Sequence, residues 1–386
     1  MLRRHVIKKF LKTFNHVESG HITLTMPDGK VYSFKGKNEG PTADLVIYNL
    51  NAIHQFATKG DIGFAESYRE KYWDSNDLIS LFKFGLTNES TFQKYIHGGI
   101  LGRFISRLGN FLNHNSVRGS KKNILAHYDL GNEFYELWLD PTMTYSSAIF
   151  ENENDTLISA QCRKYDRIIE NLNDSGNLLE IGCGWGGFVE RALTKRDYSV
   201  KAITISDAQY SYAKNRLKDS VIVCSEDYRA QEGKYNQIVS IEMFEAVGEK
   251  LWDTYFRKIK NLLAEKGKAC VQTIMINECH FERYRRSGDA IRRFIFPGGM
   301  LPSLERFTAA SAKAGLVVTD RFAFGQDYAL TMKHWLMAFD DKFEQVKKMG
   351  FDEKFIRIWR FYLTSCIASF QMGRINVMQI ALEHAR

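Results

Sequence analysis

The amino-acid sequence predicts an α/β fold in which a doubly wound parallel sheet is joined to a small α+β domain. From Asn177 onward, short β-rich runs alternate with helical runs, a pattern typical of parallel strands connected by helices. Near the start of the chain, apolar and polar residues alternate around Pro27-Asp28-Gly29, which indicates a β-hairpin. We therefore expect a small N-terminal domain at 1–90, a linker at 91–122 and a larger domain at 123–386.

The individual elements follow from the same patterns. Helices of the small domain are expected at 52–58 and 65–73. Strands of the large domain are expected at 178–181, 200–205, 221–224, 237–242 and 269–276, and its helices at 187–195, 207–217 and 251–265. Later helical patterns at 278–293, 327–348 and 355–373 are expected to form a cap over one side of the sheet. Because ligands of doubly wound sheets bind at the carboxyl ends of the strands, functional residues should directly follow strands.

Composition indicates an ordinary globular protein with a large core, since 44% of its 386 residues are hydrophobic and 25% are charged. We find no apolar window of roughly 18 residues that would predict a membrane span. The basic stretch at 1–12 lacks the features of a secretory signal, so we expect a cytoplasmic protein. The six cysteines form no CxxC or CxxH pair, which argues against a zinc site and a disulfide framework. We predict no metal.

The net charge of +8 is concentrated in two basic amphipathic stretches. Residues 90–128 contain no Asp or Glu but several Lys and Arg among aliphatic residues, and Val6, Ile7, Phe10 and Leu11 form an apolar stripe in a basic N-terminal segment. Both stretches suit an anionic phospholipid surface, where each Lys or Arg adds about 1 kcal/mol. A helix docked on its own protein and a nucleic-acid patch remain open as alternatives.

The stretch LLEIGCGWGGF, residues 178–188, predicts a cofactor loop because Gly182, Gly184 and Gly187 match GxGxxG. A P-loop is excluded, since no Lys-Ser or Lys-Thr follows. A dinucleotide site has its acid at the end of the second strand, whereas here Glu180 ends the first. The loop therefore favours S-adenosylmethionine, and NAD stays open as the alternative.

Several segments together closely resemble the cyclopropane fatty acid synthases, also called cyclopropane-fatty-acyl-phospholipid synthases. They are HYDLGNEFYELWLDPTMTYSSAIF, LLEIGCGWGGF, AITISDAQ, IVSIEMFEAVGEK and FIFPGGMLPS. The resemblance extends from about residue 123 to the C-terminus. It continues more weakly in GDIGFAESYREKYWDSNDL, which is similar to the N-terminal domain of phospholipid-acting members. It implies a Rossmann-like class I methyltransferase domain with a helical cap, and a lipid- or membrane-associated domain at 1–90.

The resemblance also implies a reaction. Family members transfer the methyl group of S-adenosylmethionine to a cis double bond in a membrane phospholipid acyl chain, and loss of a proton then closes a cyclopropane ring. Attack by an alkene leaves a carbocation, so water must be excluded and aromatic walls are favourable. The implied partners are an unsaturated phospholipid and the anionic inner face of the membrane, with peripheral association and a possible homodimer. Nucleic acid is disfavoured, because the basic stretches contain aliphatic more than stacking aromatic residues.

The resemblance assigns a set of residues to S-adenosylmethionine, to which the loop adds Glu180. Gln209 would hydrogen-bond the ribose and Asp227 would accept from the adenine amino group. The full set is Tyr145, Ser146, Gly182, Gly184, Thr204, Ile205, Gln209, Asp227, Tyr228 and Ile241.

The family uses a bound bicarbonate ion as proton acceptor, and the resemblance places five groups of this chain around it. They are the backbones of Ser147 and Ile274 and the side chains of Glu245, Gln272 and Tyr328. Beside an anion, Glu245 is expected to be protonated or to share a proton. Tyr128, in the upstream segment, is also assigned to the catalytic group.

This chain departs from the family pattern at two of these positions. Ser147 replaces a frequent cysteine, and Gln272 replaces a histidine. Glutamine can donate a hydrogen bond to bicarbonate but cannot titrate near neutral pH. We predict that bicarbonate binding and cyclopropanation are kept, with a methyl-branched or methylene product as the alternative. Methylation of RNA, protein or a small amine, and lipid binding without catalysis, are the rival functions.

Overall fold

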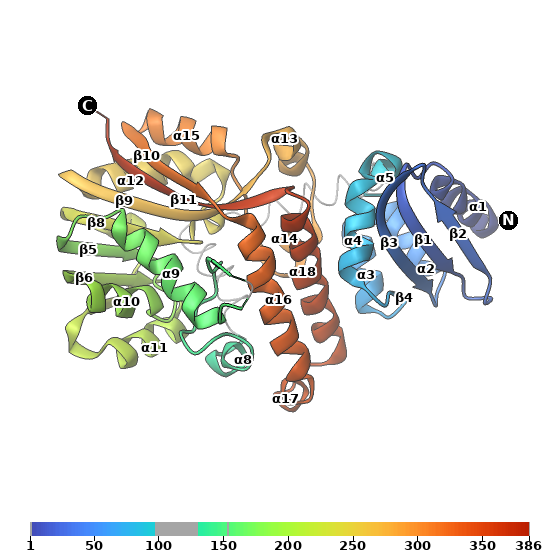
Figure 1. The fold of residues 1–386 in the computed structure, drawn as a ribbon, viewed down its shortest axis with the longest axis horizontal. Helices are drawn as coiled ribbons and strands as arrows, with labels where there is room; N and C mark the ends of the chain where they lie inside the picture. Colours follow the sequence, from blue (N-terminus) through green and yellow to red (C-terminus); the bar gives the residue numbers. More distant parts are fainter. Residues whose placement is uncertain (1, 97–129, 153, 386) are drawn as a thin grey trace. The chain divides into compact units, whose positions relative to one another are not determined.

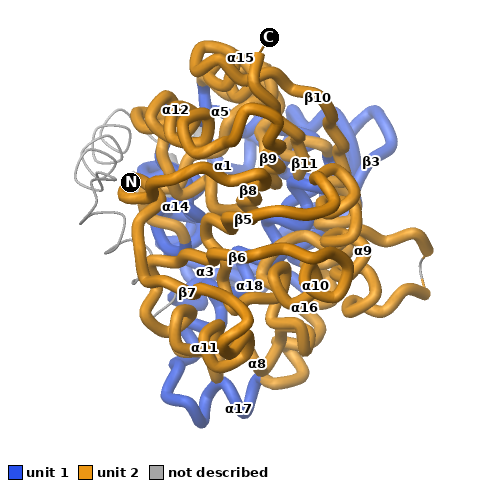
Figure 2. The backbone as a smooth tube through the Cα atoms, turned by 90° about the vertical axis from the view of Figure 1, so that its left-hand side faces the viewer, with its two compact units in different colours: residues 1–112, 283–295, 343–372 blue, residues 113–282, 296–342, 373–386 orange. Residues whose placement is uncertain are grey.

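The computed structural model describes residues 2–96, 130–152 and 154–385 (Figure 1). The chain divides into two compact units (Figure 2). Unit 1 comprises 1–112, 283–295 and 343–372, and unit 2 comprises 113–282, 296–342 and 373–386. Unit 1 thus includes two segments from the range assigned by sequence to the larger domain, since local patterns do not indicate which distant helix packs on which sheet. The boundary at residue 90 stays a prediction.

Unit 2 is built on a seven-stranded sheet with the order β10-β11-β9-β8-β5-β6-β7. The five strands predicted from the sequence are present and parallel, which confirms the α/β class. Two further strands, β11 and β10, extend the edge in antiparallel orientation. The strands are β5 (Ser175–Ile181), β6 (Asp197–Thr204), β7 (Ile222–Ser225), β8 (Tyr235–Ile241), β9 (Leu263–Ile276), β10 (Leu316–Ala323) and β11 (Ile375–His384).

Helices cover both faces of this sheet, as Figure 2 shows. On one face, α9 and α10 bury a cluster of residues that includes Ile168, Phe188 and Val189 against β5 and β6. The rings of Phe244, Phe256 and Phe307 pack together where α12 and α15 meet. The helices of unit 2 are α8 (Asn132–Glu136), α9 (Leu157–Glu170), α10 (Gly187–Lys195), α11 (Asp207–Leu217), α12 (Trp252–Leu262), α15 (Leu304–Lys313) and α16 (Gly325–Asp341), and α13 (Glu278–Arg286) begins in it.

Unit 1 contains a four-stranded sheet with the order β2-β1-β3-β4. Its first two strands are antiparallel, which confirms the predicted hairpin. The strands are β1 (Ser19–Thr25), β2 (Val31–Lys35), β3 (Asn38–Ile47) and β4 (Trp73–Asp74). The helices are α1 (Leu2–Phe14), α2 (Asn51–Lys59), α3 (Asp61–Arg69), α4 (Leu78–Thr87), α5 (Glu89–Ile96), α14 (Ala290–Phe294), α17 (Phe343–Lys348) and α18 (Glu353–Gln371). Part of the predicted cap, α18, therefore belongs to unit 1.

One buried arginine ties α18 to the rest of unit 1. Arg357 donates to the carbonyl oxygens of Tyr68 (2.6 Å) and Trp73 (3.0 Å) and to Asp74 Oδ2 (2.9 Å). Its guanidinium also lies 3.8 Å from the ring centroid of Tyr68. Because the guanidinium is buried, these acceptors replace the water that it loses on folding.

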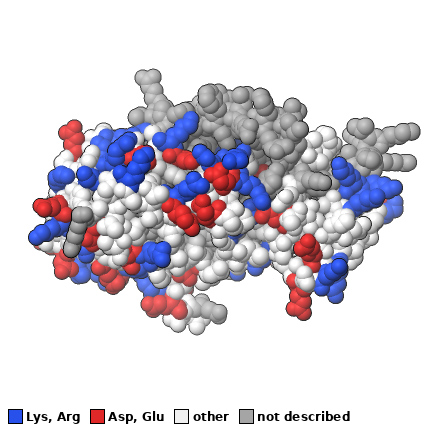
Figure 3. Space-filling model, turned by 90° about the horizontal axis from the view of Figure 1, so that it is seen from above, with Lys and Arg blue, Asp and Glu red and all other residues white. Residues whose placement is uncertain are grey.

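Of the two basic amphipathic stretches, the structure describes the N-terminal one and only the beginning of the one at 90–128. In α1, Phe10 and Phe14 are buried in the core of unit 1 and Leu11 packs against it, so this stripe is a core contact, as in the docked-helix alternative. Lys8 and Lys9 on the opposite side of α1 are exposed. Most of the stretch at 90–128 lies outside the described residues. On the face shown in Figure 3, basic and acidic side chains are interspersed.

No helix in the described ranges is long and apolar enough to cross a bilayer.

Candidate active site

The glycine loop leaves β5 with a backbone that only glycine adopts easily. Gly182, Gly184 and Gly186 have φ values of 81°, 53° and 85°, in the left-handed region. A Cβ at Gly182 would lie 2.9 Å from Cγ of Met243, whereas a Cβ at Gly184 would meet no atom within 4 Å. The loop is therefore packed closely at its first glycine and open at its second, which leaves room for a ligand.

Glu180 is held beside this loop as a nearly isolated acid. Its side chain is 2% exposed, and its Oε2 has no hydrogen-bond partner among the described residues. Burial raises the pKa of Glu180 to about 8, with the charge of Lys164 opposing the shift. A buried acceptor without a donor fits a site that a hydrogen-bonding ligand completes. The cofactor assigned to Glu180 by sequence agrees with this geometry.

The other residues predicted to bind S-adenosylmethionine follow the next strands. The Thr204 hydroxyl donates to Gln209 Oε1 (2.8 Å), which leaves the amide nitrogen of Gln209 as the donor for a ribose. Asp227 accepts from Arg229, and the buried Tyr228 hydroxyl has no partner in the described chain. Ile205 and Ile241 are partly exposed at the ends of β6 and β8. These residues fit the cofactor, and their individual contacts to it stay predictions.

The Tyr145-Ser146 segment joins the loop to a buried amine that the sequence did not reveal. Lys164, fully buried on α9, donates from Nζ to Ser146 Oγ at 2.7 Å. Burial lowers the pKa of Lys164 to about 7, although the nearby Glu242 raises it. The ring of Tyr145 packs beside Trp335, with 5.2 Å between centroids. The segment therefore has the buried amine of Lys164 on one side and aromatic rings on the other.

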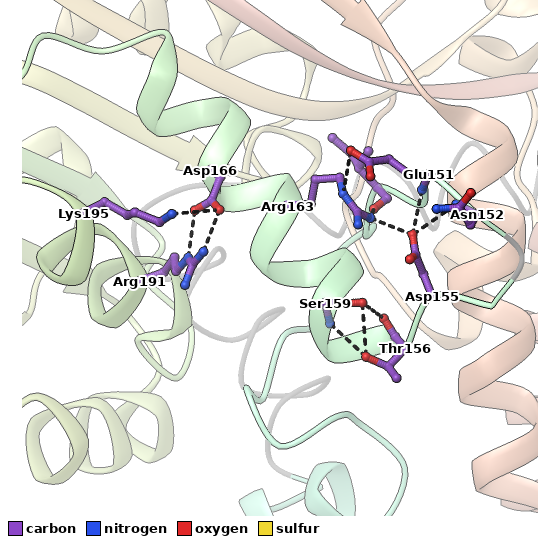
Figure 4. A network of polar contacts seen from close by, with 10 residues as sticks. Glu151, Asn152, Asp155, Thr156, Ser159, Arg163, Asp166, Arg191 and Lys195 are labelled. Atoms are coloured by element: carbon purple, nitrogen blue, oxygen red, sulfur yellow. Dashed lines mark hydrogen bonds and ion pairs between the residues drawn. The ribbon is translucent and has the colours of Figure 1, made fainter.

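Polar contacts on both flanks hold α9 and therefore Lys164 in place (Figure 4). At its start, the Thr156 hydroxyl caps the helix by accepting from the Ser159 N–H at 3.2 Å. Farther along, Arg191 on α10 makes a bidentate ion pair with Asp166, in which its Nε lies 2.8 Å from Oδ1 and its Nη2 lies 2.6 Å from Oδ2. Such pairing fixes geometry as well as adding energy.

The centre of the site is the carboxylate of Glu242, which the sequence analysis did not single out. Its Oε1 accepts from the backbone N–H of Ser147 (2.9 Å) and from Nε2 of Gln272 (2.8 Å). Its Oε2 accepts from the hydroxyl of Tyr328 on α16 (2.5 Å). Burial raises the pKa of Glu242, while these three hydrogen bonds and the charge of Lys164 oppose that shift.

Glu242 also has an unusual backbone. The predicted strand at 237–242 is wrong at its last residue, because β8 ends at Ile241 and Glu242 has a φ of 49°. A non-glycine residue in the left-handed region costs on the order of 1–3 kcal/mol and persists where the surroundings enforce it. Here the Glu242 N–H donates to the carbonyl of Gln272 at 2.7 Å. The strained turn aims the side chain between β9 and α16.

A chain of side chains fixes the orientation of the Gln272 amide. Arg167 can only donate, and its Nη1 donates to Oε1 of Gln379 (3.1 Å). The Nε2 of Gln379 therefore faces Gln272 and donates to its Oε1 (3.1 Å). This leaves the Gln272 NH₂ to donate to Glu242. Three donors surround Glu242, an arrangement that favours its ionised form.

The predicted bicarbonate site is present as a set of donors but is already filled. Ser147, Gln272 and Tyr328 come together as expected, around Glu242. The fourth donor, the N–H of Ile274, bonds to Oε1 of Glu245 at 2.5 Å. A bicarbonate ion therefore does not fit among these residues. Tyr128, also assigned to the catalytic group, lies outside the described residues.

Glu245 occupies a position beside this cluster. Its Oε2 is buried and has no partner among the described residues. Burial, and then the charge of Glu242, raise the pKa of Glu245 to about 8. Two neighbouring carboxyl groups do not both ionise easily in a buried site, so the proton resides on Glu245 and the charge on Glu242.

The sequence contains signals for Glu242 and Lys164, the two site residues that the sequence analysis missed. Glu242 directly follows a predicted strand, as functional residues of such sheets do. Lys164 lies on the buried stripe of α9 together with Ala160 and Ile168, so the helical period places this position inward although its side chain is charged.

A family model and the most similar curated proteins agree on the family that this chain resembles. A family model described as mycolic acid cyclopropane synthetase matches residues 115–380. The tuberculostearic acid methyltransferase UfaA1 of Mycobacterium tuberculosis is 30% identical over 367 residues, covering 88% of this chain and 82% of the relative. The cyclopropane-fatty-acyl-phospholipid synthase of Escherichia coli K12 is 30% identical over 354 residues, covering 89% and 88%.

A solved structure is similar as well. The mycolic acid cyclopropane synthase CmaA1, complexed with SAH and CTAB, superposes with a TM-score of 0.63 at 31% identity. The match covers 68% of this chain and 97% of that chain.

Proposed function

Because the chain belongs to the mycolic acid cyclopropane synthetase family of S-adenosylmethionine-dependent methyltransferases, we propose that it methylates cis double bonds of unsaturated phospholipid acyl chains and closes a cyclopropane ring. The methyl carbon goes to one olefinic carbon and the C–S electron pair stays on sulfur. The other olefinic carbon becomes cationic until a proton leaves the added methyl group and the ring closes.

The observation that carries this proposal is the partly buried carboxylate of Glu242, which directly follows β8 and accepts from a tyrosine that belongs to an aromatic cluster. The Tyr328 ring, whose hydroxyl reaches Glu242, lies 5.9 Å from Trp335, and Trp335 lies 5.2 Å from Tyr145. Ring faces stabilise a nearby cation by about 0.5–2 kcal/mol each. A carboxylate next to this aromatic cluster adds electrostatic stabilisation where the positive charge develops. Both features suit carbocation chemistry.

For the substrate, an acyl chain presented by a phospholipid bilayer is supported by the name of the Escherichia coli relative. We place the enzyme at the inner face of the membrane, as a peripheral protein. The exposed residues Lys8, Lys9 and Lys12 of α1 offer positive charge to anionic headgroups, since α1 already uses its apolar side within unit 1.

One alternative product has a specific observation in its favour. Gln272 stands where the family pattern has histidine, so the groups around the departing proton differ. Two relatives are named for methyl transfer to fatty acids, UfaA1 and a probable fatty acid methyltransferase of Pseudomonas putida. A hydride shift in the cation, followed by loss of a neighbouring proton, would give a methyl-branched chain that keeps a double bond or, if the proton leaves the methyl group, a methylene chain.

The test is incubation of the protein with vesicles of monounsaturated phospholipid, part of it anionic, and methyl-labelled S-adenosylmethionine. We expect label in the acyl chains and the high-field NMR signals of ring protons. A methylene product has the same mass, so olefinic signals and uptake of hydrogen identify it. The Gln272→His variant shows whether this position selects the product. Binding of the methyl donor without any labelled lipid would refute the proposal.

A further inference from the structure

We propose that the carboxylate of Glu242 is the proton acceptor of the reaction and takes the place of a bound bicarbonate ion. The inference rests on the proposed methyl transfer to an alkene. It concerns which group collects the proton, a role for which the sequence suggested a separate inorganic anion.

The donor set is the first argument. An anion in a buried pocket is stable only when hydrogen bonds replace its water. The N–H of Ser147, the amide of Gln272 and the hydroxyl of Tyr328 are groups that the family resemblance assigned to the ion, and all three donate to Glu242 at 2.5–2.9 Å. The hydrogen-bonding capacity of these three donors is therefore taken up by the Glu242 side chain.

The charges around the site are the second argument. A second anion beside Glu242 would meet Glu245 on one side, and Lys164 is the one buried Lys side chain among the described residues. Lys164 already faces the carboxyl groups of Glu242, Asp140 and Glu180, so a bicarbonate ion would add a further negative charge at low dielectric without a further buried Lys among the described residues to balance it. The site therefore favours one anion, and Glu242 provides it.

The strained backbone is the third argument. A φ of 49° at Glu242 is unfavourable for this residue type, yet it directs the carboxyl group to the three donors. Strain of this kind is concentrated at functional sites, where the geometry itself is needed.

The proton transfer balances without another reactant. One C–H bond of the added methyl group breaks, and its electron pair forms the ring bond to the cationic carbon. The proton goes to a carboxylate oxygen of Glu242, which becomes a neutral carboxylic acid and loses the proton to water before the next turnover. A base whose pKa is raised by burial accepts a proton more readily than an exposed carboxylate.

The experiment uses the full chain, vesicles of monounsaturated phospholipid and buffers freed of carbon dioxide or supplied with bicarbonate. Four proteins are compared: wild type, Glu242→Gln, Glu242→Gly and the control Glu265→Gln, which removes an exposed carboxylate at the far end of β9. Thermal melting and calorimetric binding of S-adenosylmethionine check each variant. A ¹³C NMR titration with labelled bicarbonate measures anion binding independently of activity.

We expect wild type and Glu265→Gln to work equally well with and without bicarbonate and to cause no line broadening of labelled bicarbonate. Glu242→Gln should bind the methyl donor but form product roughly 10²- to 10⁴-fold more slowly, the usual effect of losing a positioned base. Glu242→Gly should be slow without bicarbonate, faster with it, and should broaden the bicarbonate line, because the vacated donors accept the ion.

Two results would overturn the inference alone: wild-type activity that requires bicarbonate, or Glu242→Gln that methylates lipid at the wild-type rate. Should Glu242→Gln fail to fold, the bicarbonate dependence and NMR titration of the wild type decide the question. If the wild type binds S-adenosylmethionine but methylates no lipid, the proposed function fails, and the role of Glu242 as acceptor fails with it.

Discussion

Replacing Tyr328 by phenylalanine removes one hydroxyl group and keeps the ring that packs beside Trp335. The lost hydrogen bond joins the hydroxyl to Oε2 of Glu242 at 2.5 Å. A hydrogen bond to a charged group contributes about 1.5–3 kcal/mol, and one pKa unit corresponds to about 1.36 kcal/mol. The pKa of Glu242 should therefore rise by about 1–2 units, because the hydroxyl stabilises only the ionised form strongly.

The direction of the pH effect follows from the role of Glu242 as a base. Product formation requires ionised Glu242, so a higher pKa moves the acid limb of the rate profile to higher pH. At neutral pH the variant should be slower than wild type, and the difference should shrink as the pH rises. The other titratable groups facing Glu242 are Glu245 and Lys164, which the substitution leaves in place.

The assay is the initial rate of label transfer to vesicles across the acidic and neutral range, at saturating methyl donor. Tyr198→Phe is the matched control, since it removes a tyrosine hydroxyl that donates to the carbonyl of Asn173 (2.7 Å), away from the site. Its acid limb should coincide with that of wild type. An unshifted limb in Tyr328→Phe, with donor binding and melting temperature intact, would refute the assignment of Glu242 as the titrating base.

Three further outcomes are expected. Gly184→Ala should weaken calorimetric binding of S-adenosylmethionine and lower the melting temperature modestly, because its Cβ meets no atom but its φ of 53° is strained for alanine. Gly182→Ala should lower the melting temperature more, because its φ of 81° is unfavourable too and its Cβ would also lie 2.9 Å from a side-chain atom of Met243. Equal effects of the two would contradict this. Glu245 keeps its proton to about pH 8 in the folded state, whereas its ordinary pKa is 4.5, so it makes folding stability fall as the pH rises through this range. Glu245→Gln should make that fall smaller in unfolding curves measured at several pH values, and the remainder comes from other buried acids such as Glu180. Arg357→Met should lower the free energy of unfolding in denaturant by about 1–3 kcal/mol for each backbone acceptor left without a donor, and an unchanged midpoint would argue against that anchor.

Much of the large domain could be predicted from the sequence, because its signals are local. The helices at 187–195 and 207–217 have the bounds that periodicity predicts, since one follows a glycine loop and the other begins after Ser206, whose hydroxyl accepts from the Gln209 N–H. The antiparallel strands β10 and β11 were missed because their pairing joins segments that are distant in the sequence, which leaves no local pattern.

The site was predicted less completely for a related reason. The family resemblance implied the donors at Ser147, Gln272 and Tyr328, but not which acceptor they share. That acceptor depends on the left-handed backbone of Glu242, and a strained turn at a non-glycine residue is not indicated by propensity. Lys164 escaped notice because its burial is decided by tertiary packing of α9.

A carboxylate side chain and a diffusible bicarbonate ion could both accept the proton, but they lose their water at different stages. A bicarbonate ion must lose its water and its freedom of motion each time that it binds, and its occupancy depends on concentration. For Glu242 the desolvation and the strain at φ 49° are met once, during folding, and are offset by three hydrogen bonds and the nearby ammonium of Lys164. Replacement of histidine by Gln272 is consistent with this arrangement, since a neutral amide that is fixed by Gln379 needs only to donate to a permanent carboxylate. Glu242 after β8 and Gln272 in β9 are then parts of one hydrogen-bonded unit.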